Sequence, residues 1–246
     1  MPITYTKSMD IITDLACELL RRTPNSTTGI TLTTLEQAGI TIQQTTVENS
    51  TAAREIGKPV GTYLNLDTTT CKPRNIIKAL RHALQPLIPD TTKILIIGLG
   101  NDKFVADSLG PCVLERINTG TQFLTFEPSV FGVTGINSVD AIKAITRITR
   151  PSAVIVIDSL VSATPQRIGT NYQICTSGIT PGSGIGRDNQ TINQKLLGVP
   201  VIAIGVPVCT IMTTVPDHIF HVVPKDIDVV IRDCAEIIAA AINTLV

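Results

Sequence analysis

Two aspartates follow strand-like apolar runs in this sequence, and a pair of carboxyl groups can activate water. Asp158 ends the run VIVID at 154–158, and Asp107 stands in the segment after the run ILIIG at 94–98. A carboxyl group at the end of an apolar strand needs a partner or a shifted pKa. Two carboxyl groups at close range share a proton, so one acts as a base toward water and the other as an acid toward a leaving group. Asp107 is also suited to cap the helix predicted after it, which is a structural role.

A third segment, TSGITPGSGIG at 176–186, offers backbone groups rather than reactive side chains. Exposed N–H and C=O groups in such a loop can bind an extended peptide or stabilise an oxyanion, although the same composition suits a flexible connection. A dinucleotide site in the first loop is a weak interpretation, because Lys103 stands at the third glycine position. The candidate substrate contacts are Asn101 in the first loop and Ser177, Gly178, Gly182, Ser183 and Gly184 in the other.

Apolar periodicity predicts the elements that position these groups. Continuous apolar runs at 94–98, 153–158 and 199–205 predict strands buried on both faces, with helices at about 108–118, from Ser138 and from Pro224. Closer to the start, the sequence predicts a helix at 10–22, a hairpin around Gly39, a short helix at 49–56, a strand at 62–66 and a helix at 74–84.

This order of elements predicts an α/β fold. We expect an open, twisted, mostly parallel sheet with helices on both faces, plus a small N-terminal β-rich lobe. In such a sheet the site lies at the carboxyl ends of the strands, where Asp107 and Asp158 would meet.

Composition excludes several classes of protein. The 246 residues are 43% hydrophobic, so the chain can bury a core, and the formal net charge of +0 gives no electrostatic case for binding nucleic acid or anionic membranes. The longest apolar runs fall short of the about 20 residues that cross a bilayer, and the start of the chain lacks the pattern of a secretory signal. The six cysteines include no CxxC pair, which favours core thiols over a disulfide or zinc framework. His82, His218 and His221 make poor metal ligands, and no HExxH, GxSxG or P-loop motif occurs.

Several of these segments, taken in order, resemble the germination protease family, the endopeptidases of spore-forming bacteria that degrade small acid-soluble spore proteins. The shared motifs are GLGN and ADSLGP around Asp107, GVTGINSVDAI, VIVIDSL around Asp158, SGITPGSGIG and LLGVPVIAIGVP. TDLA at 13–16, IGKPVGTY at 56–63 and VPKDID at 223–228 extend the resemblance over nearly the whole chain. Each motif is weak alone, but the ordered set is specific.

The resemblance implies that Asp107 and Asp158 are the two essential aspartates of a protease. Of the possible catalytic types we favour the aspartic one, in which the pair activates water, and we expect no cofactor and no metal. The resemblance also implies an inactive zymogen that removes its own propeptide, here residues 1–14, by cutting the bond between Asp14 and Leu15. A β-rich and helical region at 15–90 and a catalytic core at 91–246 would form one integrated domain. The expected partners are small acid-soluble spore proteins as substrates and copies of the chain in a homotetramer. The expected location is cytoplasmic, without contact with nucleic acid or membrane.

The chain departs from the family pattern at three positions and in one segment. Ala163, Thr180 and Ile211 stand where the family has Arg, His and Asp, and the family's long segment before the C-terminal helix is missing. Two alternatives stay open. A nickel-dependent hydrogenase-maturation endopeptidase shares GxGN and an aspartate at the end of the second strand, but its histidine ligand has no counterpart at Thr180. A catalytically inactive paralogue, acting as a binding or structural protein, would keep the fold without the chemistry.

Overall fold

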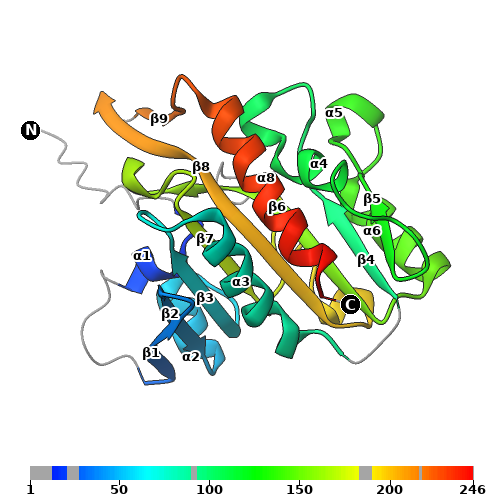
Figure 1. Cartoon of the computed structure of the whole chain (residues 1–246), viewed down its shortest axis with the longest axis horizontal. Helices are drawn as coiled ribbons and strands as arrows, with labels where there is room; N and C mark the ends of the chain where they lie inside the picture. The colour runs from blue at the N-terminus through cyan, green and yellow to red at the C-terminus, as the bar shows by residue number, and fades with distance from the viewer. Residues whose placement is uncertain (1–12, 21–27, 90–92, 183–189, 216–217, 246) are drawn as a thin grey trace, which may run out of the picture.

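One mixed sheet forms the centre of the computed structural model, which describes residues 13–20, 28–89, 93–182, 190–215 and 218–245. The strands are β1 (Ile30–Gln37), β2 (Ile40–Val47), β3 (Gly61–Asp67), β4 (Ile94–Gly98), β5 (Phe123–Phe126), β6 (Ala153–Ser162), β7 (Asn171–Cys175), β8 (Val201–Val215) and β9 (His218–Val222). They lie in the order β1-β2-β3-β7-β8-β6-β4-β5, and β9 pairs with β8 off this path (Figure 1).

The strands β8, β6, β4 and β5 are neighbours and run parallel. The predicted strands at 94–98, 153–158 and 199–205 are confirmed as β4, β6 and β8, and the last two extend beyond the predicted ends. Because parallel strands share one carboxyl edge, Asp158 in β6 and the loop that follows β4 come to the same edge of the sheet.

The N-terminal strands continue the same sheet by antiparallel pairing. β1 and β2 form the predicted hairpin, and its two-residue turn places Ala38 and Gly39 at φ of 53° and 76°. Such a turn with two positive φ values matches the twist of paired strands. β3 then joins β2 to β7, and β7 pairs with β8. The β-rich region is therefore joined to the core through one continuous set of backbone hydrogen bonds.

Helices cover both faces of the sheet, as the fold prediction requires. On one face, α4 (Leu109–Leu114) packs on β4 and β6, and α8 (Ile227–Asn243) packs on β8. On the same face, α3 (Pro73–Leu84) packs on β2 and against α8. Figure 1 shows α8 lying in front of the sheet alongside β8. On the opposite face, α6 (Ser138–Thr149) and α7 (Gln194–Leu197) pack on the alternate residues of β4 and β6. The helices α1 (Ala16–Leu20) and α2 (Ser50–Ile56) cover β2, β3 and β7 on this second face.

Three predicted helix boundaries are wrong by a few residues. The helix expected at 10–22 is not yet formed at 13–15, and α1 starts at Ala16. The helix expected at 108–118 is α4, which starts at Leu109 and ends at Leu114. The last helix starts at Ile227 rather than Pro224. Pro224 belongs to a turn before it, in which the Pro224 carbonyl accepts a hydrogen bond from the Ile227 N–H. Single turns of 3₁₀ helix occur at Gln85–Leu87, Val105–Asp107 and Pro165–Arg167, and a short α5 spans Phe131–Thr134.

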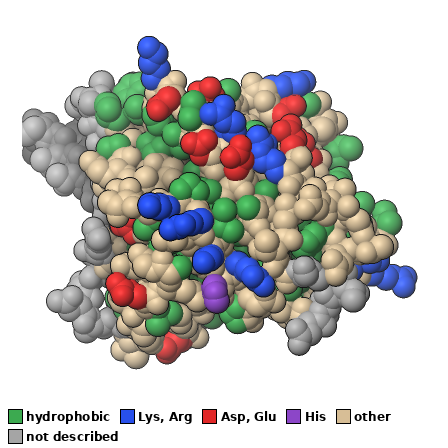
Figure 2. Space-filling view, in the orientation of Figure 1, with side chains coloured by type: hydrophobic (Ala, Val, Ile, Leu, Met, Phe, Trp, Pro, Cys, Tyr) green, Lys and Arg blue, Asp and Glu red, His purple; other side chains and the backbone are tan. Residues whose placement is uncertain are grey.

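The charge on the surface is uneven although the net charge is zero. Figure 2 shows basic side chains gathered over α3, where Lys72, Arg74, Lys78 and Arg81 are exposed. Among the described residues, no helix is both long and apolar enough to cross a membrane.

Candidate active site

Asp158 occupies a buried position in β6, a central strand of the sheet, near the edge where the parallel strands have their carboxyl ends. β6 is apolar up to this residue and pairs with β4 on one side and β8 on the other, so the Asp158 side chain is only 8% exposed. Its Oδ1 accepts a hydrogen bond of 2.9 Å from the Ser159 N–H. The prediction that the strand ends at Asp158 is wrong, because β6 continues to Ser162.

Close backbone packing brings Asp107 to the same edge. Gly100 has a φ of 118°, and the Asp107 carbonyl oxygen occupies the place where a Cβ of residue 100 would be. The Asn101 N–H donates to that carbonyl at 2.9 Å, and the Asp107 N–H donates to Phe104. Asp107 thus ends the 3₁₀ turn Val105–Asp107 and does not cap α4, whose preceding residue is Ser108.

The two aspartates line one cavity of about 160 Å³ at the carboxyl edge of β4 and β6. Leu99, Phe131 and Gly182 contribute to its walls. Burial raises the pKa of Asp158 well above its usual value, and the nearby charge of Asp107 raises it further; Asp14 adds a smaller effect in the same direction, which the Ser159 hydrogen bond opposes. The arrangement therefore keeps Asp158 protonated at a pH where an exposed aspartate would be ionised.

The segment from Thr13 to Glu18 lies across this edge of the sheet. The Asp14 N–H donates to the Val161 carbonyl, and the Val161 N–H donates to Asp14 Oδ2, each at 2.9 Å. Leu15 is 0% exposed and packs against Leu160. The predicted cleavage bond between Asp14 and Leu15 is therefore buried beside β6. Most of the predicted propeptide, residues 1–12, lies outside the described residues.

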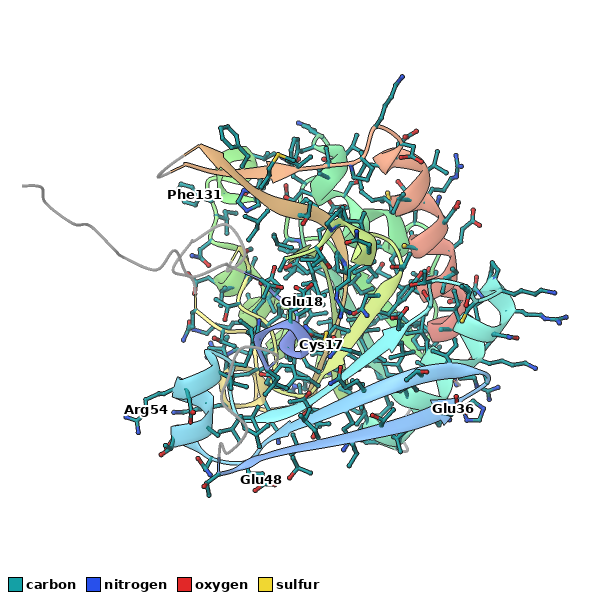
Figure 3. All side chains as sticks on the ribbon, turned by 90° about the vertical axis from the view of Figure 1, so that its left-hand side faces the viewer. Cys17, Glu18, Glu36, Glu48, Arg54 and Phe131 are labelled. Carbon is teal, nitrogen blue, oxygen red and sulfur yellow. The ribbon has the colours of Figure 1, made fainter. Side chains whose placement is uncertain are left out.

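Glu18 anchors the other end of that segment. It is 6% exposed and pairs with Arg167 at 3.1 Å, while the Ala163 N–H donates to its Oε2 at 2.7 Å. Thr164 donates to Oε1 at 3.3 Å, and Thr13 donates to Oε2. Figure 3 shows Cys17 and Glu18 toward the centre of the molecule, whereas Arg54 lies at its periphery.

The candidate substrate contacts are distributed over two neighbouring cavities. Gly182 lines the cavity of the aspartates, whereas Ser177 and Gly178 line a second cavity of about 110 Å³ together with Asp14. Asn101 lines neither of these two cavities; its side chain accepts from the Lys103 N–H and stabilises the loop. Ser183 and Gly184 lie outside the described residues.

The three positions that depart from the family pattern have structural partners. The backbone of Ala163 binds Glu18, and the Thr180 hydroxyl lies 2.7 Å from the Thr191 hydroxyl at the wall of the second cavity. Ile211 pairs with His221 between β8 and β9. Among the described residues, no three His, Cys, Asp or Glu side chains gather as a metal site requires.

Cysteine chemistry is not favoured near this site. Burial, followed by the charges of Asp14 and Asp107, raises the pKa of the Cys209 thiol to about 11. A thiol with such a pKa stays protonated at neutral pH and is a poor nucleophile.

The sequence did not indicate the roles of three residues, Glu18 within the segment at 13–18 and Arg167 and Gln173 that contact it. Glu18 and Arg167 form the buried ion pair, and Gln173 in β7 hydrogen-bonds to Asp14 and Ala16. No motif contains Gln173. In the sequence it is one long amide side chain within the short run NYQIC, which does not indicate a binding partner.

Comparisons with known proteins agree with the motifs. A family model described as germination protease matches residues 8–223. The germination protease of Clostridium tetani is 32% identical over 87% of this chain and 75% of that protein. Those of Caldanaerobacter subterraneus and Bacillus cytotoxicus are 30% and 32% identical, and this chain covers 68% and 62% of their lengths. Among solved structures, a [NiFe] hydrogenase maturation protease from Thermococcus kodakarensis has a TM-score of 0.45 and 19% identity, covering 65% of this chain and 97% of that one.

Proposed function

This chain belongs to the germination protease family, and from that membership we propose that it is an endopeptidase that cuts small acid-soluble spore proteins during germination. We further propose that it is made as a zymogen, which removes its first 14 residues itself. The observation that carries the proposal is the cavity shared by Asp107 and Asp158, in which Asp158 has a raised pKa.

The carboxyl pair supplies the chemistry of peptide hydrolysis without a covalent intermediate. Asp158 holds the shared proton because it is the buried member of the pair, and Asp107 is the carboxylate that accepts a proton from water. The water oxygen then bonds to the carbonyl carbon of the substrate. As the C–N bond breaks, Asp158 gives its proton to the departing nitrogen. The pair then again holds one proton, the one that Asp107 took from water.

Self-processing is supported by the location of the Asp14–Leu15 bond. Asp14 is close enough to the pair for its charge to raise the pKa of Asp158. Its backbone and carboxylate are both held on β6 by hydrogen bonds to Val161. A bond held in the cavity next to that of the two carboxyl groups is in effect at high local concentration.

Family membership also supports the choice of substrate, the assembly and the location. Small acid-soluble spore proteins are the substrates that the resemblance implies, in a cytoplasmic homotetramer. The chain covers 62% of the Bacillus cytotoxicus relative and 68–75% of the two others. Because it is shorter than these relatives, its substrate is a proposal and is not carried over from them.

The mass of the N-terminus after incubation tests the catalytic pair. Purified full-length chain is expected to convert to a form that starts at Leu15, and the same preparation should then cleave a small acid-soluble spore protein. Asp158→Asn should fold but give no conversion, with Asp140→Asn, an exposed aspartate in α6, as the matched control.

Two results would contradict the proposal in different ways. Conversion of Asp158→Asn at the normal rate would remove the aspartate mechanism. A wild-type chain that neither converts nor cuts a spore protein would favour the inactive paralogue.

A further inference from the structure

Gln173 lies on the same face of the sheet as Asp158. In register, Asp158 of β6 pairs with Gly205 of β8, and Gly205 pairs with Gln173 of β7. Paired residues in adjacent strands project to one face, so the side chains of Asp158 and Gln173 flank a residue that has no side chain. Since neighbouring strands lie about 4.8 Å apart, the two backbones are separated by roughly 10 Å.

The side-chain amide of Gln173 binds the peptide on both sides of Leu15. Its Nε2 donates to the Asp14 carbonyl at 3.0 Å, and its Oε1 accepts from the Ala16 N–H at 2.9 Å. The partners fix the orientation of the amide, because a carbonyl can only accept and a backbone N–H can only donate. Gln173 is 6% exposed, so these bonds are shielded from water.

The carbonyl that Gln173 binds belongs to the Asp14–Leu15 peptide bond. The opposite side of Asp14 is held by its two hydrogen bonds to Val161. Gln173 and Val161 therefore bind this residue from β7 and β6, the two strands that flank β8. These hydrogen bonds from two strands fix the orientation of the Asp14 carbonyl group.

We propose that Gln173 is a catalytic residue for hydrolysis of this bond, as the donor that stabilises the charge on the carbonyl oxygen, an inference that rests on the proposed function. When water adds to the carbonyl carbon of Asp14, negative charge develops on its oxygen, and the Nε2–H bond to that oxygen strengthens. The C–N bond to Leu15 then breaks, and the nitrogen takes a proton from the carboxyl pair. A single donor of this kind typically contributes about 10²–10³-fold to the rate.

Two substitutions separate this role from a merely structural one. Gln173→Glu keeps the size and the acceptor for Ala16 but loses the Nε2 donor when ionised. Conversion at neutral pH should fall about 100-fold, and acidification should restore it, because a protonated carboxyl group donates again. Asp14, Lys58, Tyr63 and Cys175 line the same cavity as residue 173, and Asp158 and Asp107 lie beyond it. Gln173→Met, which neither donates nor accepts in this way, should convert slowly at every pH.

The experiment measures conversion by intact mass across a pH series, with thermal unfolding of each variant as the check on folding. Gln194→Glu, the same change at an exposed residue of α7, is the matched control and should follow the wild-type profile. Wild-type rates for both Gln173 variants at all pH values would overturn the inference while leaving the catalytic pair intact. Conversion of Asp158→Asn, measured in parallel, would instead overturn the proposed function.

Discussion

The buried carboxyl group of Asp158 affects folding as well as the chemistry proposed for it. Because its pKa is raised in the folded state, the folded chain holds the Asp158 proton more tightly than the unfolded chain does. The free energy of unfolding therefore decreases as the pH rises from the ordinary aspartate pKa through the raised one. A residue placed for catalysis commonly reduces stability in this way.

Asp158→Asn should accordingly be more stable than the wild type at neutral pH. The difference should shrink on acidification and vanish below the ordinary aspartate pKa, where the wild-type carboxyl is protonated in both states. Denaturant unfolding at neutral and acid pH measures this difference in the free energy of unfolding. In thermal unfolding, each kcal/mol of it corresponds to about 2–4 °C in melting temperature for a chain of this size. If Asp158→Asn were no more stable than the wild type at neutral pH, burial would not be raising the pKa of Asp158.

Asp107 and Asp158 are expected to act as a unit. Asp107→Asn should abolish conversion of the N-terminus as Asp158→Asn does. The double variant should be no slower than either single one, because each change already removes one of two groups that must act together. Rate constants from intact mass measure this. Additive losses would instead mean that the two carboxyl groups act independently.

The two aspartates could be predicted from the sequence because each follows an apolar run, and parallel strands bring such residues to one edge. Gln173 could not be predicted, because its role depends on the register of three strands, β6, β8 and β7, that are distant along the chain. Glu18 and Arg167 were missed for the same reason: nothing local indicates that a glutamate near the start pairs with an arginine 149 positions later.

At the level of elements, the contact between β4 and α4 determines where Asp107 lies. A Cβ on Gly110 would approach the Leu99 carbonyl oxygen to 2.3 Å and the Leu99 nitrogen to 2.6 Å. These are backbone atoms, which cannot rotate away as a side chain can. The absence of a Cβ is thus what allows α4 to approach the loop after β4 so closely.

Gly110→Ala should destabilise the chain by about 1–3 kcal/mol and slow conversion by displacing Asp107. Gly120→Ala is the control, since a Cβ at Gly120 would meet no atom within 4 Å. Thermal unfolding and conversion rates of the two variants should differ clearly. Equal effects would show that the close approach at Gly110 relaxes without cost.

The elements themselves were predictable to different degrees. Long apolar runs gave β4, β6 and β8, and the hairpin of β1 and β2 followed from alternation around Gly39. β5 and β7 were missed, since FLTF and NYQIC are short and carry polar residues. β7 exists because β3 and β8 pair with its two edges, which is a tertiary effect.

For the whole molecule, the ion pair of Glu18 and Arg167 joins the N-terminal segment to the core. Its side chains are 6% and 16% exposed, so removing the cation leaves a buried carboxylate. Arg167→Ala should therefore cost roughly 3 kcal/mol and loosen the segment that carries the Asp14–Leu15 bond.

The control for this change is Arg232→Ala, whose ion pair with Asp233 is more than half exposed on both sides. An exposed pair contributes about 0–1 kcal/mol, so its removal should leave the melting temperature and the conversion rate nearly unchanged. If both arginine variants behaved alike, the Glu18 pair would not be what holds the segment.

The burial of Leu15 has one more consequence, for the kinetics of maturation. Asp14 and Leu15 are 8% and 0% exposed. A protease in solution, including another copy of this chain, therefore cannot reach the bond between them unless the chain that carries it partly unfolds. Maturation should therefore be a first-order event within each molecule, with a half-life that does not change when the sample is diluted a hundredfold. The rate at which such a precursor matures is determined by its own structure and does not depend on its concentration in the cell.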